Sequence, residues 1–498
     1  MGKQSKGHAI MISVPYQGHI NPFINLALKL ASKGFTITFA HLEFVHQKLS
    51  KAHHSGNGTE VDLFTEARES GLDIRYATIN DGFPLEFDRV LNFDEYWGII
   101  LRDFASLVDE FVGKTIQSEP FIVPFLVTDA VFYPWPATIA DKYDIVNVAF
   151  WTQPALVFSL SYHLDLLREK GHFPCKDNVE DEINYVPGVE SINTRDLMSY
   201  FKEDGFPIIL YKTLPLTFEG VKKSDFIVHN TVDEESDILS ALNKYQPNYA
   251  IGPINFSKNL TTNSISKSLW SESDCTQWLE SKSPGSVLYV SFGSFVHTSK
   301  QIIEEIAYGL LLSEVNFIWV IREGILNSGD TNHVLPVGFE DEIKDKGLIV
   351  PWCDQITVLS NPAVGGFLTH NGWNSTVESM WCGVPMISYP IAFEQVTNMK
   401  LVVDDWKIGI RLCDHGMSVD RKIVAEKIKS VMCGGSISKR LRQEADKVKT
   451  VMRDALETDG SSKRNFDQFV EDLEAKIAST TTNVKKFDQP ARDASIDQ

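Results

Sequence analysis

The sequence has few cysteines, and none of them form a C-x-x-C pair. Its six cysteines are spread along 498 residues, a pattern that indicates neither a zinc site nor a disulfide framework. The chain also lacks any apolar run near the ~18 residues that a membrane span needs. The stretch before Pro15 has too few apolar residues for a signal-peptide core. We therefore expect a protein of the reducing cytoplasm without a stable membrane anchor.

The chain also has fewer basic than acidic residues. The chain has 47 Lys and Arg against 66 Asp and Glu, which gives a formal net charge of −19. A surface this acidic repels nucleic acid phosphates and anionic lipids, so we expect no nucleic acid partner. The 43% of hydrophobic residues excludes a mainly disordered chain. The length predicts two large domains or three ordinary ones.

Short apolar runs recur along the chain and are separated mostly by helix-length segments. They lie at 9–14, 36–40, 125–128, 145–150, 287–292, 317–321, 348–350, 366–369 and 386–389. Runs that are apolar on both faces and alternate with helices predict an α/β fold with parallel sheets covered on both sides. For the first helix we expect Asn21 as N-cap, Pro22 as the first helical residue and Gly34 just past its end.

A polar stretch rich in Ser, Thr and Asn divides the two groups of predicted strands. It predicts an interdomain linker at 253–271. We accordingly expect a first domain at 1–252, a second domain at 272–459 and a C-terminal helix at 460–479. The apolar stripe of that helix predicts that it packs back toward the first domain. The few apolar residues in 480–498 predict a disordered tail.

Polar residues follow many of the predicted strands. In an open parallel sheet, ligands bind outside the carboxyl ends of the strands, so such residues are candidates for one common site. In the first half of the chain they are His19, Asp129 and Thr152. In the second half they are Ser294, Trp352, Gln355, His370, Glu394 and Gln395.

His19 and Asp129 together predict a general base. A carboxylate at the end of a neighbouring strand would hold one imidazole nitrogen and leave the other free to take a proton from a hydroxyl group. No G-x-S-x-G motif and no catalytic cysteine context is present, so no nucleophile competes with this interpretation. For His19 taken alone, an ordinary loop histidine is the alternative.

The segment 369–383 predicts an anion site at the start of a helix. Gly372 permits a close backbone approach, and Asn374 can cap the helix whose free amide groups point at a ligand. An ordinary helix cap is the alternative for Asn374 alone. The expected convergence of His370 and Ser294 on the same point favours a diphosphate.

The 44 residues from Trp352 to Gln395 closely resemble the plant secondary product glycosyltransferase box, and read WCDQITVLSNPAVGGFLTHNGWNSTVESMWCGVPMISYPIAFEQ. From His8 to about residue 477 the chain is similar to plant family 1 UDP-glycosyltransferases. This resemblance implies the GT-B fold, in which two Rossmann-like domains with parallel sheets face each other. It also implies that the first domain binds a small-molecule acceptor and the second a UDP-sugar.

The resemblance also implies a role for each matching residue. Trp352 would stack on uracil, Gln355 would contact the nucleoside and Glu378 would bind the ribose. The diphosphate would be held by His370, Asn374, Ser375 and Ser294, and the sugar by Trp373, Glu394, Gln395 and Thr152. His19 would be the general base and Asp129 its partner. Cys353 departs from the Ala usual at its position, as Asn371 departs from a frequent Cys, but the family contacts there are mainly through the backbone.

We therefore expect an inverting UDP-dependent glycosyltransferase that moves glucose from UDP-glucose, a co-substrate, to a hydroxyl group of a small plant metabolite. No cofactor and no metal ion are expected. UDP-galactose or UDP-rhamnose is the alternative donor, and a noncatalytic nucleotide-sugar-binding protein is the alternative class. An NAD-dependent oxidoreductase is a weaker rival, because no G-x-G-x-x-G turn follows the first strand. Loops near Phe83, Phe132 and Phe393 predict an acceptor pocket for an aromatic or terpenoid body.

Overall fold

The computed structural model describes residues 5–52, 62–132, 134–176, 180–203, 205, 207–232, 235–256, 268–326, 334–413 and 417–487. Residues 257–267 of the predicted linker and 488–498 of the predicted tail lie outside these ranges.

Among the described residues, seven strands of the N-terminal half form one sheet in the order β3-β2-β1-β4-β5-β8-β9, and every neighbouring pair is parallel. The strands are β1 (His8–Ile12), β2 (Thr36–Leu42), β3 (Ile74–Ile79), β4 (Pro124–Asp129), β5 (Val146–Trp151), β8 (Phe226–His229) and β9 (Asn248–Ala250). The helices of this half are α1 (Gln17–Ser32), α2 (Glu43–Ala52), α3 (Thr65–Glu69), α4 (Phe93–Ile100), α5 (Phe104–Ser118), α6 (Trp135–Tyr143), α7 (Ala155–Tyr162), α8 (Leu164–Glu169), α9 (Ile208–Val221) and α10 (Ser236–Leu242). A short antiparallel pair, β6 (Glu182–Ile183) and β7 (Ile192–Asn193), lies apart from the sheet.

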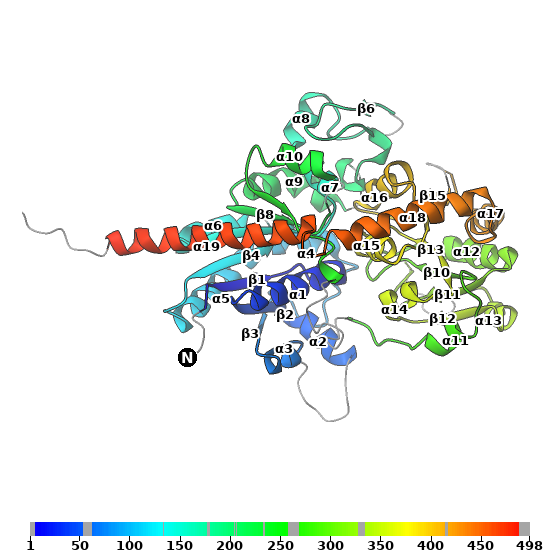
Figure 1. The fold of residues 1–498 in the computed structure, drawn as a ribbon, viewed down its shortest axis with the longest axis horizontal. Helices are drawn as coiled ribbons and strands as arrows, with labels where there is room; N and C mark the ends of the chain where they lie inside the picture. Colours follow the sequence, from blue (N-terminus) through cyan, green and yellow to red (C-terminus); the bar gives the residue numbers. More distant parts are fainter. Residues whose placement is uncertain are drawn as a thin grey trace, which may run out of the picture.

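Six strands of the C-terminal half form a second sheet among the described residues, in the order β12-β11-β10-β13-β14-β15, again parallel throughout. The strands are β10 (Val287–Ser291), β11 (Asn316–Val320), β12 (Gly347–Val350), β13 (Val364–Thr369), β14 (Met386–Ser388) and β15 (Gly409–Arg411). The helices are α11 (Thr276–Glu280), α12 (Lys300–Ser313), α13 (Phe339–Ile343), α14 (Gln355–Ser360), α15 (Trp373–Cys382), α16 (Gln395–Lys400), α17 (Arg421–Met432), α18 (Ser436–Asp454) and α19 (Ser461–Phe487). Figure 1 shows the two halves side by side.

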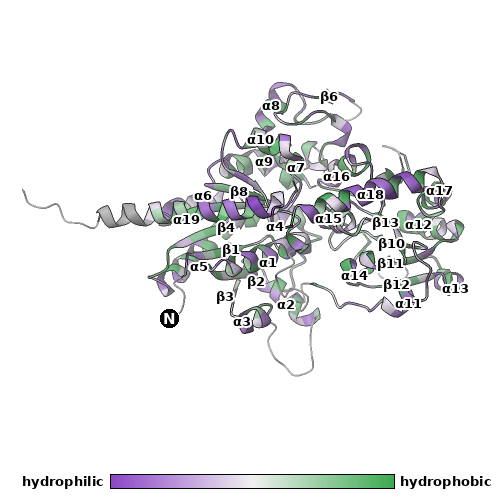
Figure 2. Cartoon of the chain, in the orientation of Figure 1, coloured by the Kyte–Doolittle hydropathy of each residue, from purple (hydrophilic) through white to green (hydrophobic). Residues whose placement is uncertain are grey.

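The strands are buried because helices cover both faces of each sheet. Every residue of β1, β2, β5 and β10 is buried, as expected for parallel strands. The prediction of an α/β fold with parallel sheets is therefore confirmed. Polar residues instead gather on helices at the surface, and Figure 2 draws most of α18 as hydrophilic.

Helix α1 corrects the predicted helix start. It begins at Gln17 rather than at Pro22, so that Pro22 lies inside the helix. A proline inside a helix leaves the carbonyl four residues earlier without its usual partner. Here that carbonyl belongs to Gly18, and it accepts a hydrogen bond from Asn374 Nδ2 at 3.0 Å. The proline therefore frees a carbonyl for the C-terminal half and places His19 in the first turn of α1.

Helix α19 crosses from the C-terminal half to the N-terminal sheet (Figure 1). Its apolar stripe, Phe466, Phe469, Val470, Leu473 and Ile477, belongs to the hydrophobic core of the N-terminal half. The helix ends at Phe487 rather than at 479, because no Gly or Pro interrupts residues 480–487. No helix within the described residues is both long enough and apolar enough to cross a membrane.

Candidate active site

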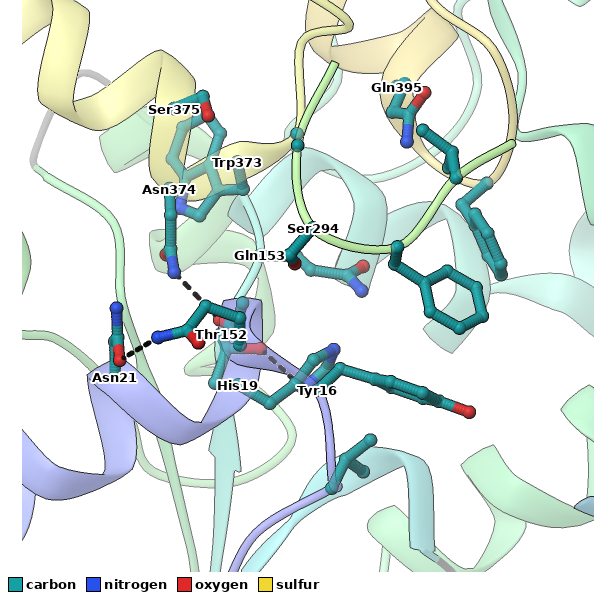
Figure 3. A pocket seen from close by; sticks show the side chains of 18 of the residues that line it. Tyr16, His19, Asn21, Thr152, Gln153, Ser294, Trp373, Asn374, Ser375 and Gln395 are labelled. Atoms are coloured by element: carbon teal, nitrogen blue, oxygen red, sulfur yellow. Dashed lines mark hydrogen bonds between the residues drawn. The ribbon is translucent and has the colours of Figure 1, made fainter. Parts of the chain in front are cut away.

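A cavity of about 940 Å³ lies where the carboxyl ends of the two sheets meet, and residues from both halves line it. Figure 3 shows Tyr16, His19 and Thr152 from the N-terminal half on one side, with Asn374 and Ser375 on the other. Parallel strands bring their carboxyl ends to the same edge of a sheet, so loops far apart in sequence converge at this cavity.

His19 is held at the cavity by two groups at the carboxyl ends of the neighbouring strands β4 and β5. Its Nδ1 lies 2.6 Å from Asp129 Oδ2 and 3.0 Å from Thr152 Oγ1. The Asp129 side chain is 1% exposed, whereas that of His19 is 17% exposed. Because Asp129 and Thr152 contact Nδ1, the Nε2 edge of the imidazole is left facing the cavity. This is the arrangement that a general base requires.

Opposing effects set the pKa of His19. Burial favours the neutral ring and lowers the pKa, but the charge of Asp129 and its hydrogen bond favour the protonated ring, with a smaller contribution from Glu394. Together the carboxylates outweigh burial, and the pKa of His19 is raised above its ordinary value. The imidazole is therefore a stronger base than an isolated histidine.

The turn that precedes α15 is built around the ring of His370. Asn371 adopts φ 61°, a left-handed conformation that Asn tolerates better than most residues, and Asn398 Nδ2 donates to its carbonyl at 2.8 Å. A Cβ on Gly372 would lie 2.5 Å from His370 Nε2, and one on Gly293 would collide with the same ring. Both glycines are needed for the close contact that leaves the ring at the helix start.

His370 differs from His19 in charge. Burial, followed by the nearby charge of Arg322, lowers the pKa of His370 to about 4, while a backbone contact with Ser291 opposes them. The ring is therefore neutral at pH 7. It faces the first turn of the ten-residue helix α15, whose first amide groups have no partners within the helix and carry a partial positive charge. A neutral donor and a helix N-terminus together suit an anion.

A polar network lies at one end of the cavity. Gln355 Nε2 donates to Ser375 Oγ at 2.9 Å and to Glu378 Oε2 at 2.6 Å, which joins α14 to α15. The Trp352 ring borders the network and has its centroid 5.8 Å from that of Trp270. Flat rings beside an amide and a carboxylate form a surface suited to a base and a diol.

The other end of the cavity is formed by the loop before α16. Gln395 Oε1 accepts hydrogen bonds from the Ile391 and Ala392 amides at 2.9 and 3.0 Å, so its amide nitrogen remains for a ligand. Burial raises the pKa of Glu394, although its own backbone amide and the charge of His19 oppose the shift. Trp373 is nearly buried, and its Nε1 donates to the Asn230 carbonyl of the N-terminal half at 2.8 Å.

Nearly all of the predicted site residues lie on this one cavity. Those lining it are His19, Thr152, Ser294, Trp352, Cys353, Gln355, His370, Gly372, Trp373, Asn374, Ser375, Glu378, Phe393, Glu394 and Gln395. Asp129 lies behind His19 rather than on the wall.

Two predicted acceptor residues, Phe83 and Phe132, are not among the residues that line the cavity. Phe83 packs on Phe87 with ring centroids 4.5 Å apart. Phe132 is fully buried and lies behind Trp97, with centroids 6.2 Å apart. Both rings pack against other aromatic side chains instead of lining the cavity, so their part in acceptor binding stays a prediction.

Comparison with known proteins decides the family. The family model described as UDP-glucoronosyl and UDP-glucosyl transferase matches residues 257–439. UDP-glycosyltransferase 86A1 of Arabidopsis thaliana is 49% identical over 488 residues, which cover 97% of each chain. The chain belongs to the plant UDP-glycosyltransferase family. It is an enzyme of the family 1 type that the sequence predicted.

Further similarities agree with this membership. The 7-deoxyloganetin glucosyltransferase of Catharanthus roseus is 35% identical over 493 residues, which cover 95% of this chain and 97% of the relative. Medicago truncatula UGT71G1 complexed with UDP-glucose has a TM-score of 0.75 at 25% identity, covering 94% of this chain and 98% of that chain. Os79 from O. sativa, in complex with U2F and trichothecene, has a TM-score of 0.77 at 25% identity, covering 93% and 100%. The glycosyltransferase has the GT-B fold.

Sequence reasoning missed the aromatic wall of the glycosyltransferase. Tyr16 and Phe295 face each other across the two halves with centroids 4.5 Å apart, and Phe93 lies 5.7 Å from Phe295. Trp97 completes the wall and donates from Nε1 to Tyr16 Oη at 2.8 Å. Tyr16 and Phe295 adjoin Gln17 and Ser294 at strand ends, so a search of those loops for apolar residues would have found them. Phe93 and Trp97 lie on α4 instead, which begins well after the end of β3, so no strand-end polar residue adjoins them that would have drawn attention to them.

Proposed function

We propose that this glycosyltransferase inverts the anomeric carbon as it transfers glucose from UDP-glucose to a hydroxyl group of a small plant metabolite. The observation that carries the proposal is the hydrogen bond between His19 Nδ1 and Asp129 Oδ2 at 2.6 Å. It orients a base toward a cavity whose opposite wall suits a nucleotide sugar. The six cysteines, which include no C-x-x-C pair, suit a reducing cytosol, where we propose that the enzyme acts.

In the proposed complex, the second half of the chain holds the donor. Trp352 stacks on uracil, Gln355 contacts the nucleoside and Glu378 accepts hydrogen bonds from the ribose. The diphosphate lies at the start of α15, with His370, Asn374, Ser375 and Ser294 as donors and Gly372 at the closest backbone approach. The sugar lies toward Trp373, Glu394, Gln395 and Thr152, while the Cys353 backbone borders the base.

The reaction is a single displacement. His19 Nε2 takes the proton of the acceptor hydroxyl as the oxygen attacks C1 of glucose, and the bond between C1 and the diphosphate oxygen breaks. The electron pair of that bond leaves with UDP, whose new charge is stabilised by His370 and the α15 amide groups. Asp129 stabilises the protonated imidazole. One displacement turns the α-linked donor into a β-glucoside.

Two kinds of support favour glucose as the donor. A relative that is 35% identical is a 7-deoxyloganetin glucosyltransferase, and the similar Medicago truncatula UGT71G1 structure contains UDP-glucose. In this chain, the Gln395 side-chain nitrogen remains available for sugar hydroxyls, because its oxygen is held by two backbone amides.

The acceptor is proposed to be a neutral, flat and largely apolar alcohol or phenol. Tyr16, Phe93, Trp97, Phe295 and Phe393 give its part of the cavity an aromatic wall. Among the described residues that line the cavity there is no Lys or Arg. A carboxylate acceptor would lose its hydration without gaining a cationic partner, and Glu394 would repel it.

The proposal predicts that UDP-glucose and 2-naphthol give a β-glucoside. Turnover is followed by UDP release, and the anomer is assigned by NMR of the product. As matched controls, 2-naphthoate in place of 2-naphthol and UDP-galactose in place of UDP-glucose should both react at least about tenfold more slowly. An α-glucoside would contradict the single displacement. Naphthoate turnover above that of naphthol would contradict the neutral acceptor, and faster turnover with UDP-galactose would contradict the donor.

We also propose that catalysis needs no metal ion. Within the described residues, no group of three or more His, Cys, Asp or Glu side chains is placed to hold one, and the donor site offers a helix N-terminus with neutral donors instead. Turnover in EDTA should equal turnover in buffer alone, with added Mg²⁺ as the comparison. A reversible loss of most activity on chelation would contradict this prediction.

A further inference from the structure

Arg322 is a buried cation directly behind the donor side of the cavity. It lies two residues after the end of β11, the neighbour of β10 in the sheet. The residue is 5% exposed. Within the described part of the chain no carboxylate pairs with it, and burial lowers its pKa to about 10. A buried charge without a partner is costly, so its position requires an explanation.

The guanidinium spans both ends of the loop that follows β10. Its Nε donates to the Gly293 carbonyl at 3.0 Å and its Nη2 to the Val296 carbonyl. Its Nη1 donates to the Glu323 carbonyl at 3.1 Å. Between the two anchored residues, Ser294 and Phe295 line the cavity. Arg322 therefore fixes a loop that carries one residue of the proposed diphosphate site and one of the acceptor wall.

The charge of Arg322 also acts across this loop. Gly293, which accepts from Arg322, packs so closely on the His370 ring that a Cβ there would collide with it. After burial, the charge of Arg322 is the next cause of the lowered pKa of His370. One residue thus separates the guanidinium from the ring that faces the diphosphate site.

The cavity itself offers a diphosphate no full positive charge. The described residues that line it include no Lys or Arg, and His370 is neutral at pH 7 because its pKa is about 4. A bound diphosphate brings about two negative charges into a place shielded from water, where charges interact strongly. Arg322 is a cation that contacts the back of the loop carrying Ser294, one residue of that site.

We propose that Arg322 is a positioning residue for the donor, which fixes loop 293–296 and supplies from behind it the positive charge that balances the diphosphate. This inference rests on the proposed placement of the diphosphate at Ser294 and His370. It explains why, among the described residues, this buried cation is held by backbone carbonyls alone: a carboxylate partner would cancel the charge that the ligand uses.

The test compares UDP with uridine, which share the nucleoside but not the phosphates. Calorimetry should show that Arg322→Met weakens UDP binding by about tenfold or more and leaves uridine binding unchanged. Arg322→Lys keeps the positive charge but loses the planar set of guanidinium N–H donors. Because the charge is kept, its preference for UDP over uridine should stay within about threefold of wild type. In turnover assays, Arg322→Met should raise KM for UDP-glucose more than Arg322→Lys does.

Arg89→Met is the matched control. Arg89 is also 5% exposed and donates to loop carbonyls, but it pairs with Asp81 and is not among the residues that line the cavity. Its replacement should lower the temperature of unfolding without changing UDP affinity. If Arg322→Met does not fold, the UDP preference of Arg322→Lys alone decides the question.

Three results would overturn the inference. They are an Arg322→Met variant that keeps its UDP preference, one that loses UDP and uridine binding equally, and an Arg322→Lys variant as impaired as Arg322→Met. In each of these cases, if the wild type binds UDP more tightly than uridine, the proposed diphosphate site is still supported. A wild type that binds UDP and uridine equally would overturn that site and this inference together.

Discussion

Replacing His19 with alanine should lower kcat by about 10² to 10⁴ while UDP still binds with nearly wild-type affinity. The imidazole is assigned to the proton of the acceptor hydroxyl, and this interaction develops mainly in the transition state. It lies on the N-terminal half, held by Asp129 and Thr152, across the cavity from the proposed nucleotide site. Steady-state turnover with UDP-glucose and 2-naphthol measures the change.

His172→Ala is the matched control for this experiment. His172 is 16% exposed on its side chain, close to the 17% of His19, and also has a carboxylate neighbour, with Nε2 3.4 Å from Asp181. It lies outside the large cavity, so its loss should leave kcat within about twofold of wild type. Near-normal turnover by His19→Ala would contradict the assignment of the base.

The pH profile gives a second readout of the same base. Because the pKa of His19 is raised, the ring gains a proton as the pH falls through that pKa and can then no longer act as a base. The kcat/KM should therefore decline on the acid side with a midpoint above the ordinary histidine value. Asp129→Asn removes the charge that raises the pKa, so the midpoint should move to lower pH, along with a loss of kcat. An unmoved midpoint would contradict the role of Asp129.

Replacing His370 with alanine should weaken UDP binding and also slow transfer. The ring is neutral at pH 7 because its pKa is about 4, so it contributes a hydrogen bond rather than a charge. The diphosphate is present in the bound donor and gains charge as it leaves, so the loss should affect both states. We expect kcat to fall by about 10² or more, as when a donor is removed from an oxyanion site.

His370→Gln serves as the control for this change. The amide keeps a neutral N–H donor, so it should recover part of the UDP affinity that alanine loses. Gly372→Ala tests the same site by displacing the ring, since the new Cβ would lie 2.5 Å from His370 Nε2. Its losses of UDP affinity and of kcat should resemble those of His370→Ala. Wild-type UDP affinity in His370→Ala would contradict the placement of the diphosphate.

The parallel sheets could be predicted because their central strands are continuous apolar runs. Four strands of the two parallel sheets were not predicted: β3, β8, β9 and β15. β9 and β15 have three residues each and lie at sheet edges, where half-exposed backbone requires no apolar run. β3 is also an edge strand with partly exposed residues. For these edge strands the sheet determines the conformation, and the local sequence does not. β8 is different, because it is an inner, fully buried strand whose short apolar run, Phe226 to Val228, was overlooked.

The start of α1 was missed for a related reason. Pro22 is a good first helical residue, but here the carbonyl that it leaves unpaired, that of Gly18, accepts from Asn374 at 3.0 Å. That contact joins residues 356 positions apart and cannot be read from the local sequence. Strand-end polar residues could be predicted because parallel sheets collect them at one edge. Arg322 was missed because it acts from behind a loop.

The most direct measurement is calorimetric titration of UDP into wild type, His19→Ala and His370→Ala in parallel. It tests whether the base lies on the N-terminal half and the diphosphate site on the C-terminal half. We expect His19→Ala to bind UDP like wild type although its turnover is lost, whereas His370→Ala should bind UDP more weakly. Loss of UDP binding in His19→Ala together with wild-type binding in His370→Ala would contradict it.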